Sequence, residues 1–332
     1  MIRNTLRKLV GRRRPVVPLV PYDMFDEIRT FKDVDSAKRL ERIYHVGQNK
    51  AWAGKDVLQG LVAKHGGIHL PEEKQQALSR VFAVILWGEL AAWKVSAQLA
   101  VELTPLEAKL AATSQAHDEA RHFYVMHDYL ELLGYQPGEL PPAARATLQG
   151  VLSADTLAKK LVGMQLMVEP IALTIFQLIR ESRVEPVLME LLPYYERDEA
   201  RHVALGINHL PAMLRGMGPL DAFELWAWQL KMFELEIAGM RELGPAFRVL
   251  GVSERDVLRL GMAKQLIAFR AMAREIGHEA VAIELFKRLY DFRIEFGWPE
   301  GGEDGDRLQR LLSAMLKVVD GVKPVDTTIE AA

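Results

Sequence analysis

Apolar residues recur along most of the chain with the spacing of amphipathic α-helices. Between residues 35 and 317 the period is helical, and no window alternates apolar and polar residues as a half-buried strand does. The pattern therefore predicts an all-α protein. The predicted helices cover residues 37–46, 56–64, 71–102, 104–134, 154–181, 186–214, 220–243, 253–276, 278–296 and 307–319.

Two of the predicted helices begin with clear local signals. Pro71 is followed by two glutamates, which suit the positive end of a helix dipole. Residues Thr104 to Glu107 have the form of a capping box, with Pro105 at the first helical position. Because only two or three residues separate these two helices, we expect them to be antiparallel neighbours.

Proline and glycine mark the predicted breaks and irregularities. The segment 135–153 is rich in both and is predicted to be a connection that carries the chain across the bundle. Pro170 and Pro193 fall inside predicted helices, where each removes a hydrogen bond and should kink the axis. Beside Pro170, such irregularity either aims a neighbouring carboxylate or is a plain kink, and both interpretations stay open.

The pentapeptide Asp-Glu-Ala-Arg-His occurs twice within these helices, at residues 118–122 and 198–202. Residues three apart share one face of an α-helix. Glu119 and His122 therefore project in the same direction, as do Glu199 and His202. A helix must present its side chains in this way to offer two ligands to one metal ion.

The repeat extends upstream of the pentapeptides. Glu89 precedes Glu119 by 30 residues, and Glu169 precedes Glu199 by the same interval. Both upstream glutamates have apolar neighbours. Two helices with a single glutamate and two with Glu-x-x-His make up the ligand set of a dinuclear metal site inside a four-helix bundle.

The two halves of the repeat divide the expected ligands between two ions. The ligands expected for the first ion are Glu89, Glu119 and His122. Those expected for the second ion are Glu169, Glu199 and His202. Within these sets, the two glutamates of the pentapeptides, Glu119 and Glu199, should bridge the ions. Iron and manganese both suit such a set of carboxylates and imidazoles.

The remaining polar residues of the pentapeptides are expected to support the ligands. A metal-bound histidine usually donates its other ring N–H to a carboxylate. We expect Asp198 to accept from His122 and Asp118 to accept from His202, crosswise. Two arginines, each three residues after an aspartate, should pair with the aspartates and limit the net buried charge: Arg121 and Arg201.

Other residues near the pattern are open to more than one interpretation. Glu196 is either an additional carboxylate near the site or, as we favour, a surface partner of Arg197. Gly206 either leaves space for a substrate or allows close helix packing. Three further histidines are not expected to be ligands, although the last of them could support the site: His117, His127 and His209.

Composition limits the chemistry that this chain can support. The net charge of −2, from 42 basic and 44 acidic residues, offers no general attraction for nucleic acid, and we expect no such partner. The chain has no cysteine, which excludes disulfides and thiolate-bound iron–sulfur or rubredoxin-type centres. Any metal must therefore be bound by carboxylates and imidazoles.

The apolar stretches are all interrupted by charged residues or glutamine before they reach the roughly 20 residues that span a bilayer. We therefore expect a soluble, cytoplasmic protein. Basic residues crowd the N-terminus, but prolines follow them in place of the apolar stretch of a secretion signal. The basic arm is expected to be disordered or to bind a partner, and a weak contact with a membrane surface is the alternative.

These patterns predict one folded domain with flexible ends. Residues 1–33 form the basic arm and an extended segment, residues 34–320 the helical domain, and residues 321–332 a flexible tail. The ligand helices occupy residues 71–214, and the C-terminal helices occupy 218–320. The large side chains of the first C-terminal helix are expected to pack against the bundle: Trp226, Trp228, Phe233 and Met240.

The doubled pentapeptide and its upstream glutamates resemble the ferritin-like di-iron oxidase and oxygenase superfamily, over about residues 71–214. This group includes bacterial multicomponent monooxygenase hydroxylases, acyl-carrier-protein desaturases and ribonucleotide reductase small subunits with their ligand-binding oxidase relatives. It also includes arylamine N-oxygenases and aldehyde-deformylating oxygenases. The pentapeptide is most similar to the monooxygenase and desaturase branches. The resemblance implies a ferritin-like four-helix bundle, here with additional N- and C-terminal helices.

Three positions depart from particular branches of that superfamily. Met126 stands four residues after the first ligand histidine, where reductase small subunits often place a radical tyrosine. Met164 stands where the ligand-binding oxidases carry a tyrosine. Tyr195 stands where the arylamine N-oxygenases add a histidine, which leaves six protein ligands here.

The resemblance also implies a function. Two metal ions, Fe/Fe or Mn/Fe, would activate O2 to attack a small hydrophobic substrate by hydroxylation, desaturation or N-oxygenation. An external reductase or ferredoxin would supply electrons. The chain could act as a monomer or as a homodimer, and both alternatives stay open. The competing functions are metal storage, peroxide scavenging, and binding of a hydrophobic ligand beside a metal site. Chain length argues against a ferritin, and the lack of cysteine argues against a rubrerythrin.

Overall fold

The protein is all-α, as the hydrophobic pattern predicts. The computed structural model describes residues 28, 32, 35, 38–276, 281–300 and 307–321, and all regular structure within them is helical. The predicted basic arm and tail lie outside these residues, apart from Ile28, Lys32 and Gly321. The elements are α3 (Lys38–Lys50), α4 (Gly54–His65), α5 (Glu72–Glu102), α6 (Leu106–Leu132), α7 (Pro142–Leu152), α8 (Leu157–Leu161), η1 (Val162–Val168), α9 (Glu169–Glu181), α10 (Pro186–Leu214), α11 (Pro219–Val249), α12 (Glu254–Ile276), α13 (Val281–Gly297) and α14 (Arg307–Asp320).

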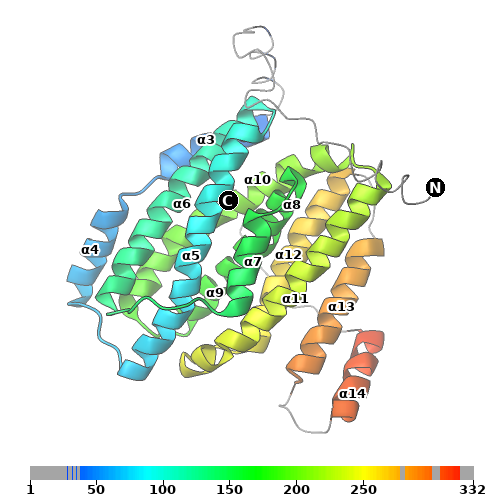
Figure 1. Ribbon diagram of the computed structural model, residues 1–332. Coiled ribbons are helices and arrows are strands. Elements are labelled where there is room, and N and C mark those ends of the chain that lie inside the picture. The colour runs from blue at the N-terminus through cyan, green and yellow to red at the C-terminus, as the bar shows by residue number, and fades with distance from the viewer. Residues whose placement is uncertain are drawn as a thin grey trace.

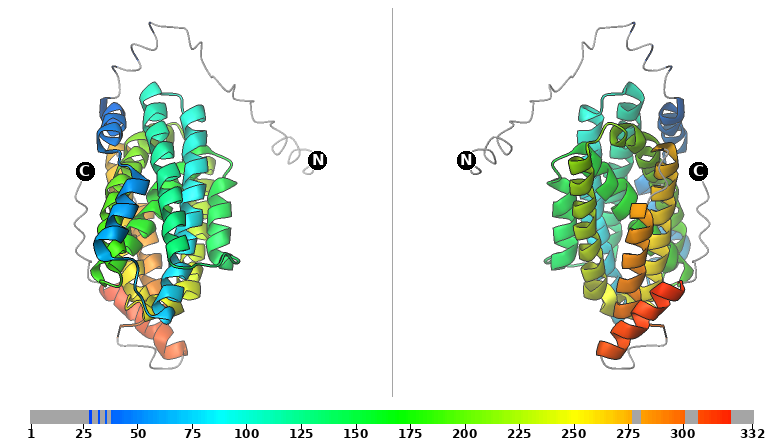
Figure 2. Two further views of the ribbon diagram at one scale, coloured as in Figure 1. Left: turned by 90° about the vertical axis from the view of Figure 1, so that its left-hand side faces the viewer. Right: turned by 90° about the vertical axis from the view of Figure 1, so that its right-hand side faces the viewer.

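The four segments that carry the predicted ligands form the centre of the molecule. Helices α5 and α6 pack along each other, and α10 packs along η1, α9 and α6 (Figure 1). The short helices α3 and α4 cover α6 and α10 on one side. On the other side, α7 and α11 pack on α5, and α12 packs on α9 and α10. Most helices run close to one axis, with α14 lying obliquely across one end (Figure 2).

The segment 135–153 contains a helix that was not predicted, because the segment is rich in proline and glycine. The prediction of a plain connection is wrong, because α7 occupies Pro142–Leu152. Pro142 stands in the first turn of α7, where a helix has no use for the missing N–H. The apolar side chains that follow have helical spacing, and Ala143, Ala144, Leu148 and Val151 are buried. Prolines therefore begin this helix rather than prevent it.

The helix expected at 154–181 is interrupted by a wider turn. Residues Val162–Val168 wind as the π-helix η1, and the α-helical hydrogen bonding resumes at Glu169. Pro170 follows at once and cannot donate a backbone hydrogen bond. The irregularity predicted beside this proline is thus present, and it lies directly before one of the expected ligands.

The capping box predicted at Thr104 does not form. Helix α6 begins at Leu106 with Pro105 as its N-cap, and no side chain caps it. Thr104 is therefore one position too early to cap the helix. Glu107, which would have to fold back over the first turn, is buried with 3% of its surface exposed.

The stretch Leu157–Glu181 corrects one expectation about membranes. By length and composition alone this stretch, whose most apolar 18-residue window has a mean hydropathy of 1.6, could cross a bilayer. In the fold, 67% of its most apolar window is buried among other helices. Its apolar character is that of a core helix in this bundle.

The first C-terminal helix packs largely as expected. Phe233 and Met240 of α11 belong to the apolar core, and Trp228 packs against that core. Trp226 is half-buried and lies beside Phe223 near the start of α11. The core thus continues from the ligand helices into α11 and α12.

Close packing accounts for the glycine after the second pentapeptide. A Cβ atom at Gly206 would lie 2.8 Å from Cβ of Gln165 and 3.1 Å from Cδ2 of Leu166. Helix α10 therefore approaches η1 too closely for a larger residue. Of the two interpretations of this glycine, the structure favours packing over an open channel.

We predict that Gly206→Ala lowers the free energy of unfolding by about 1–3 kcal/mol, because the added methyl meets the rigid start of the Gln165 side chain. Urea denaturation of the two proteins measures the change. The control is Gly60→Ala in α4, where a Cβ meets nothing within 4 Å. That change should raise stability by up to about 1 kcal/mol. Equal effects of the two substitutions would contradict the packing argument.

Candidate metal centre

The structure brings all six predicted ligands together in the middle of the bundle. Helix α5 contributes Glu89, α6 contributes Glu119 and His122, and the first residue of α9 contributes Glu169. Helix α10 contributes the remaining pair, Glu199 and His202. Each of the six residues is at most 4% exposed. Six polar groups buried at one point require compensation from protons, cations or hydrogen bonds.

The carboxylates of Glu119 and Glu199 each face both imidazoles. Oε1 of Glu119 lies 3.0 Å from Nδ1 of His202, and its Oε2 lies 3.5 Å from Nδ1 of His122. Oε1 of Glu199 lies 3.1 Å from Nδ1 of His122, and its Oε2 lies 2.9 Å from Nδ1 of His202. This is the geometry that a bridging carboxylate needs.

The other two carboxylates each belong to one imidazole. Oε2 of Glu89 lies 3.4 Å from Nδ1 of His122. Oε2 of Glu169 lies 3.6 Å from Nδ1 of His202. The six side chains therefore divide into two overlapping groups that share Glu119 and Glu199, and within each group the candidate ligand atoms lie within 4.8 Å of one another.

Unpaired atoms at the centre fit a pair of metal ions. Oε2 of Glu119 and Nδ1 of His122 are buried and have no hydrogen-bond partner among the described residues. Both atoms are strong metal ligands, and an orphaned buried polar atom is costly. Two overlapping groups of carboxylate oxygens and imidazole nitrogens are consistent with a dinuclear site, and the donor set suits iron or manganese.

The acid–base properties of these groups show that the centre attracts positive charge. Burial and the nearby carboxylate of Glu199 raise the pKa of Glu89 well above its usual range. Burial alone would lower the pKa of His122, but the surrounding carboxylates, led by Asp198, raise it well above its usual range. The crowded carboxylates therefore favour positive charge at the centre, whether it comes from protons or from metal ions.

The aspartates and histidines pair crosswise, in the arrangement expected from the repeat. Nε2 of His122 lies 3.2 Å from Oδ2 of Asp198, and Nε2 of His202 lies 3.4 Å from Oδ2 of Asp118. These contacts orient each Nδ1 toward the centre, where the glutamates lie. The aspartates thus determine which ring nitrogen is free to bind metal.

Two arginines hold the aspartates in turn. Nη2 of Arg201 donates to Oδ2 of Asp118 and lies near Oδ1 of Asp198, each at 2.8 Å. Arg121 contacts the same two aspartates, with Nη2 at 2.8 Å from Oδ2 of Asp198. Burial alone would raise the pKa of Asp198, but His122 and Arg201 together bring it well below its usual range. The four side chains form a buried, charge-balanced network behind the imidazoles.

Four residues that support the site were not predicted from the sequence: Gln115, Gln165, Tyr195 and Trp52. Gln115 donates from Nε2 to Oε1 of Glu119 and to Oε1 of Glu169, both at 3.0 Å. Gln165, in the π-helix, donates to Oε1 of Gln115 at 3.2 Å. Gln115 lies one turn before Glu119 on the same face of α6, which is a signal that could have identified it.

An aromatic pair covers the other side of the site. The ring of Tyr195 stacks on that of His122, with centroids 4.4 Å apart, and its hydroxyl donates to the His122 carbonyl at 2.9 Å. Trp52, between α3 and α4, donates from Nε1 to Oδ2 of Asp198 at 2.7 Å. No local motif marks Trp52, because its partner lies 146 residues away in the sequence.

The remaining candidates lie away from the centre. His117 and His127 are exposed, and His209 is buried two turns beyond His202. Glu196 is a surface partner, as favoured, but of Arg180 at 2.9 Å rather than of Arg197. Arg197 instead donates to the Lys50 carbonyl.

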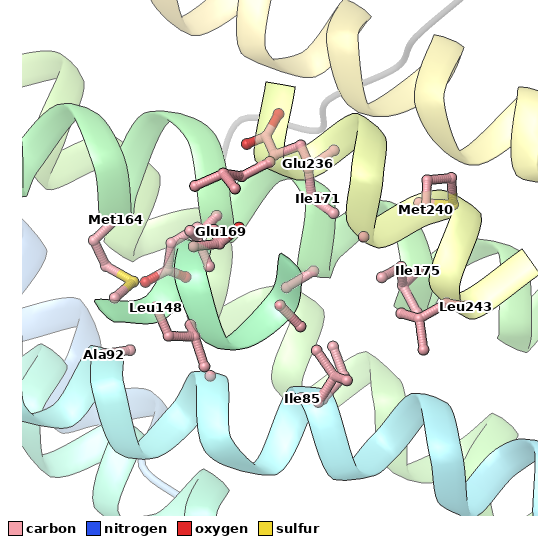
Figure 3. A pocket seen from close by; sticks show the side chains of 18 of the residues that line it. Ile85, Ala92, Leu148, Met164, Glu169, Ile171, Ile175, Glu236, Met240 and Leu243 are labelled. Atoms are coloured by element: carbon pink, nitrogen blue, oxygen red, sulfur yellow. The ribbon is translucent and has the colours of Figure 1, made fainter. Parts of the chain in front are cut away.

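An apolar cavity of about 120 Å³ adjoins the carboxylates. Glu89, Glu169 and Glu199 form part of its wall, together with apolar side chains of α5, α7, η1, α9 and α11. Met164 lies toward the Glu169 end, and Ile175, Leu243 and Met240 lie toward the other (Figure 3). The cavity therefore gives a small apolar molecule direct access to three of the predicted ligands.

Comparison with solved structures identifies the fold. The chain is similar to "Protein 19 with aldehyde deformylating oxidase activity from Synechococcus", with a TM-score of 0.53 and 21% identity over 65% of this chain and 97% of that one. The fold is ferritin-like. An R2-like ligand-binding oxidase with an Mn/Fe cofactor matches the ferritin-like bundle with a TM-score of 0.46 and 17% identity, over 82% of this chain and 96% of that one.

A variant of that oxidase with an Fe/Fe cofactor gives a TM-score of 0.43 and 18% identity, over 77% of this chain and 90% of that one. No protein-family model matches this chain, and no curated protein sequence matches it. At these identities the likeness concerns the ferritin-like fold alone.

We predict that Arg201→Ala destabilises the metal-free protein by about 3–5 kcal/mol, because it leaves two buried aspartates with only one of the two arginines that they share. Urea denaturation measures the loss. Arg288→Ala, which removes an exposed partner of Glu284, is the control and should cost no more than about 1 kcal/mol. Similar losses for the two variants would contradict a buried charge network.

We predict that Glu119→Ala or His202→Ala abolishes binding of two metal ions per chain while the helices remain formed. Metal analysis after reconstitution with Fe²⁺ gives the occupancy, and circular dichroism gives the helix content. His127→Ala, on the exposed face of α6, should keep both ions. Full occupancy in the Glu119 and His202 variants would falsify the ligand assignment.

Proposed function

We propose that this protein is an O2-activating oxidase or oxygenase with a dinuclear metal centre, acting on a small apolar substrate. The observation that carries the proposal is the apolar cavity whose wall includes Glu89, Glu169 and Glu199. A buried ligand set beside an apolar pocket suits chemistry on a bound molecule better than transport of ions. The aldehyde deformylating oxidase activity of the Synechococcus protein with the same fold supports it.

Each part of the chain would have a distinct role in this function. Glu89, Glu119 and His122 would hold one ion, and Glu169, Glu199 and His202 the other, with Glu119 and Glu199 shared. When bound, Fe/Fe or Mn/Fe would supply the electrons and the Lewis acidity that O2 reduction requires.

The surrounding residues would keep this centre in a productive arrangement. Asp118 and Asp198 fix the imidazoles, and Arg121 and Arg201 balance the aspartate charges. The aliphatic wall of the cavity excludes water and positions the apolar body of the substrate. Since the chain has no cysteine for a redox centre of its own, the electrons would come from a separate reductase or ferredoxin.

We predict that the Fe²⁺-loaded protein consumes O2 and that a small apolar compound which fits the cavity accelerates the consumption. An oxygen electrode measures the rate, and mass spectrometry of the compound identifies an oxidised product. The matched control is Gly88→Leu, because a Cβ at Gly88 meets nothing within 4 Å and this residue lines the cavity. That variant should keep its metal and lose the acceleration.

Other outcomes would favour other functions. Uptake of many more than two iron ions per chain, with formation of a mineral, would favour storage. Consumption of peroxide in place of O2 would favour scavenging. A metal-loaded protein that is inert to O2 but binds apolar compounds would be a ligand-binding bundle, and the oxidase proposal would be wrong.

A further inference from the structure

One carboxylic acid lies in the wall of the cavity without belonging to the metal centre. Glu236 is on α11, and it lines the cavity together with its neighbours Leu235, Gly239 and Met240. Figure 3 shows it on the α11 side, across from the residues of α5. Apart from the three predicted metal ligands, the other residues that line this cavity are apolar or small, with Thr147 as the one hydroxyl. Glu236 is therefore the one carboxyl there that the metal centre does not use.

The polar neighbours of Glu236 carry no charge. Nε2 of Gln265 lies 3.3 Å from Oε1 and 3.2 Å from Oε2 of Glu236. The same amide donates to the carbonyl of Met167 in the π-helix, at 3.2 Å. Burial raises the pKa of Glu236 to about 8, although hydrogen bonds from Gln265 and from the Tyr290 hydroxyl favour the ionised form. At neutral pH, most molecules therefore carry a neutral carboxylic acid here.

The hydrogen-bonding capacity of this cluster is not used up. Oε1 of Gln265 is buried and has no hydrogen-bond partner among the described residues. Glu236 itself is only half-buried, although helices surround it, since it faces the cavity. A carboxyl that served structure alone would be expected to have its donors and acceptors satisfied.

The chemistry of the cluster selects among possible ligands. A neutral carboxylic acid donates one hydrogen bond and accepts others, so it suits an uncharged oxygen such as that of an alcohol or carbonyl. A carboxylate group would have to leave water for a wall with no positive charge, and an ammonium group would first have to ionise Glu236. A wholly apolar molecule would offer the acid no hydrogen bond.

The size of the cavity limits the rest of the ligand. At about 120 Å³ it is somewhat smaller than an engineered cavity of roughly 150 Å³ that binds benzene. The ligand body is therefore of the order of one aromatic ring or a short alkyl chain.

We propose that Glu236 is a specificity-determining residue, which holds the uncharged oxygen of a small and otherwise apolar substrate while the substrate body lies against the carboxylates of the metal centre. That the ligand is a substrate rests on the proposed function. The binding selectivity is inferred only from the cavity and from the cluster around Glu236.

Four ligands with one ring and different heads test the proposal: toluene, benzyl alcohol, benzylamine and benzoate. Isothermal titration calorimetry with the purified protein, without reductant, measures their affinities under conditions that allow no turnover. We expect benzyl alcohol to bind about 3–10-fold more tightly than toluene, which corresponds to one net hydrogen bond. Benzylamine and benzoate should bind more weakly than benzyl alcohol.

Variants assign this selectivity to Glu236. Glu236→Leu should remove the advantage of benzyl alcohol over toluene, and Glu236→Gln should keep most of it because an amide also donates. Glu224→Leu is the matched control, since Glu224 is exposed on the same helix and should change nothing. Gly88→Leu should weaken binding of all four ligands and so place them in the cavity.

Several results would overturn the proposal. These are equal binding of toluene and benzyl alcohol, tighter binding of benzylamine or benzoate than of benzyl alcohol, or an unchanged advantage of the alcohol in Glu236→Leu. If Glu236→Leu fails to fold, the affinities of the unmodified protein for the four ligands still show which head group the cavity prefers. The binding experiments consume no O2. Their result can therefore contradict the role of Glu236 without contradicting the proposed oxidase function, and a failure of the oxidase function would leave the binding selectivity intact.

Discussion

The structure depends on the burial of four carboxylates and two imidazoles at one point inside a helical bundle. Burial of like charges is among the most unfavourable arrangements in a protein unless positive charge accompanies it. The chain supplies part of that charge through Arg121 and Arg201, which lie behind the imidazoles. The remainder must come from protons or metal ions at the centre, where Nδ1 of His122 faces carboxylates but has no hydrogen-bond partner among the described residues.

The surrounding architecture follows from this requirement. Two short helices, α3 and α4, cover the aspartate and arginine side, and Trp52 reaches in from the turn between them. On the opposite side α7 and α11 form part of the cavity wall beside the glutamates. These four helices therefore cover the two sides of the centre.

Sequence reasoning identified the fold and the convergence of the six side chains, because both depend on periodicity. The spacing of residues along a helix specifies which of them share a face. The matched positions of Glu89 and Glu169 indicated that their helices turn these faces toward the same centre as the two pentapeptides. Sequence reasoning missed the residues whose partners lie far away in the sequence and those that have no equivalent in the other half of the repeat. Gln115 has no counterpart in the second half, and Trp52 and Glu236 reach their partners only through tertiary packing. Helix α7 was hidden because prolines were interpreted as breaks, whereas Pro142 begins a helix.

The glutamine pair has a further consequence for the two halves of the centre. The ligands repeat almost perfectly, yet Gln115 contacts Glu119 and Glu169, whereas Tyr195 and Trp52 gather around His122. One half thus lies in an amide environment and the other in an aromatic one. The repeated ligand sequence therefore has two different surroundings, which would make two ions bound at this centre inequivalent.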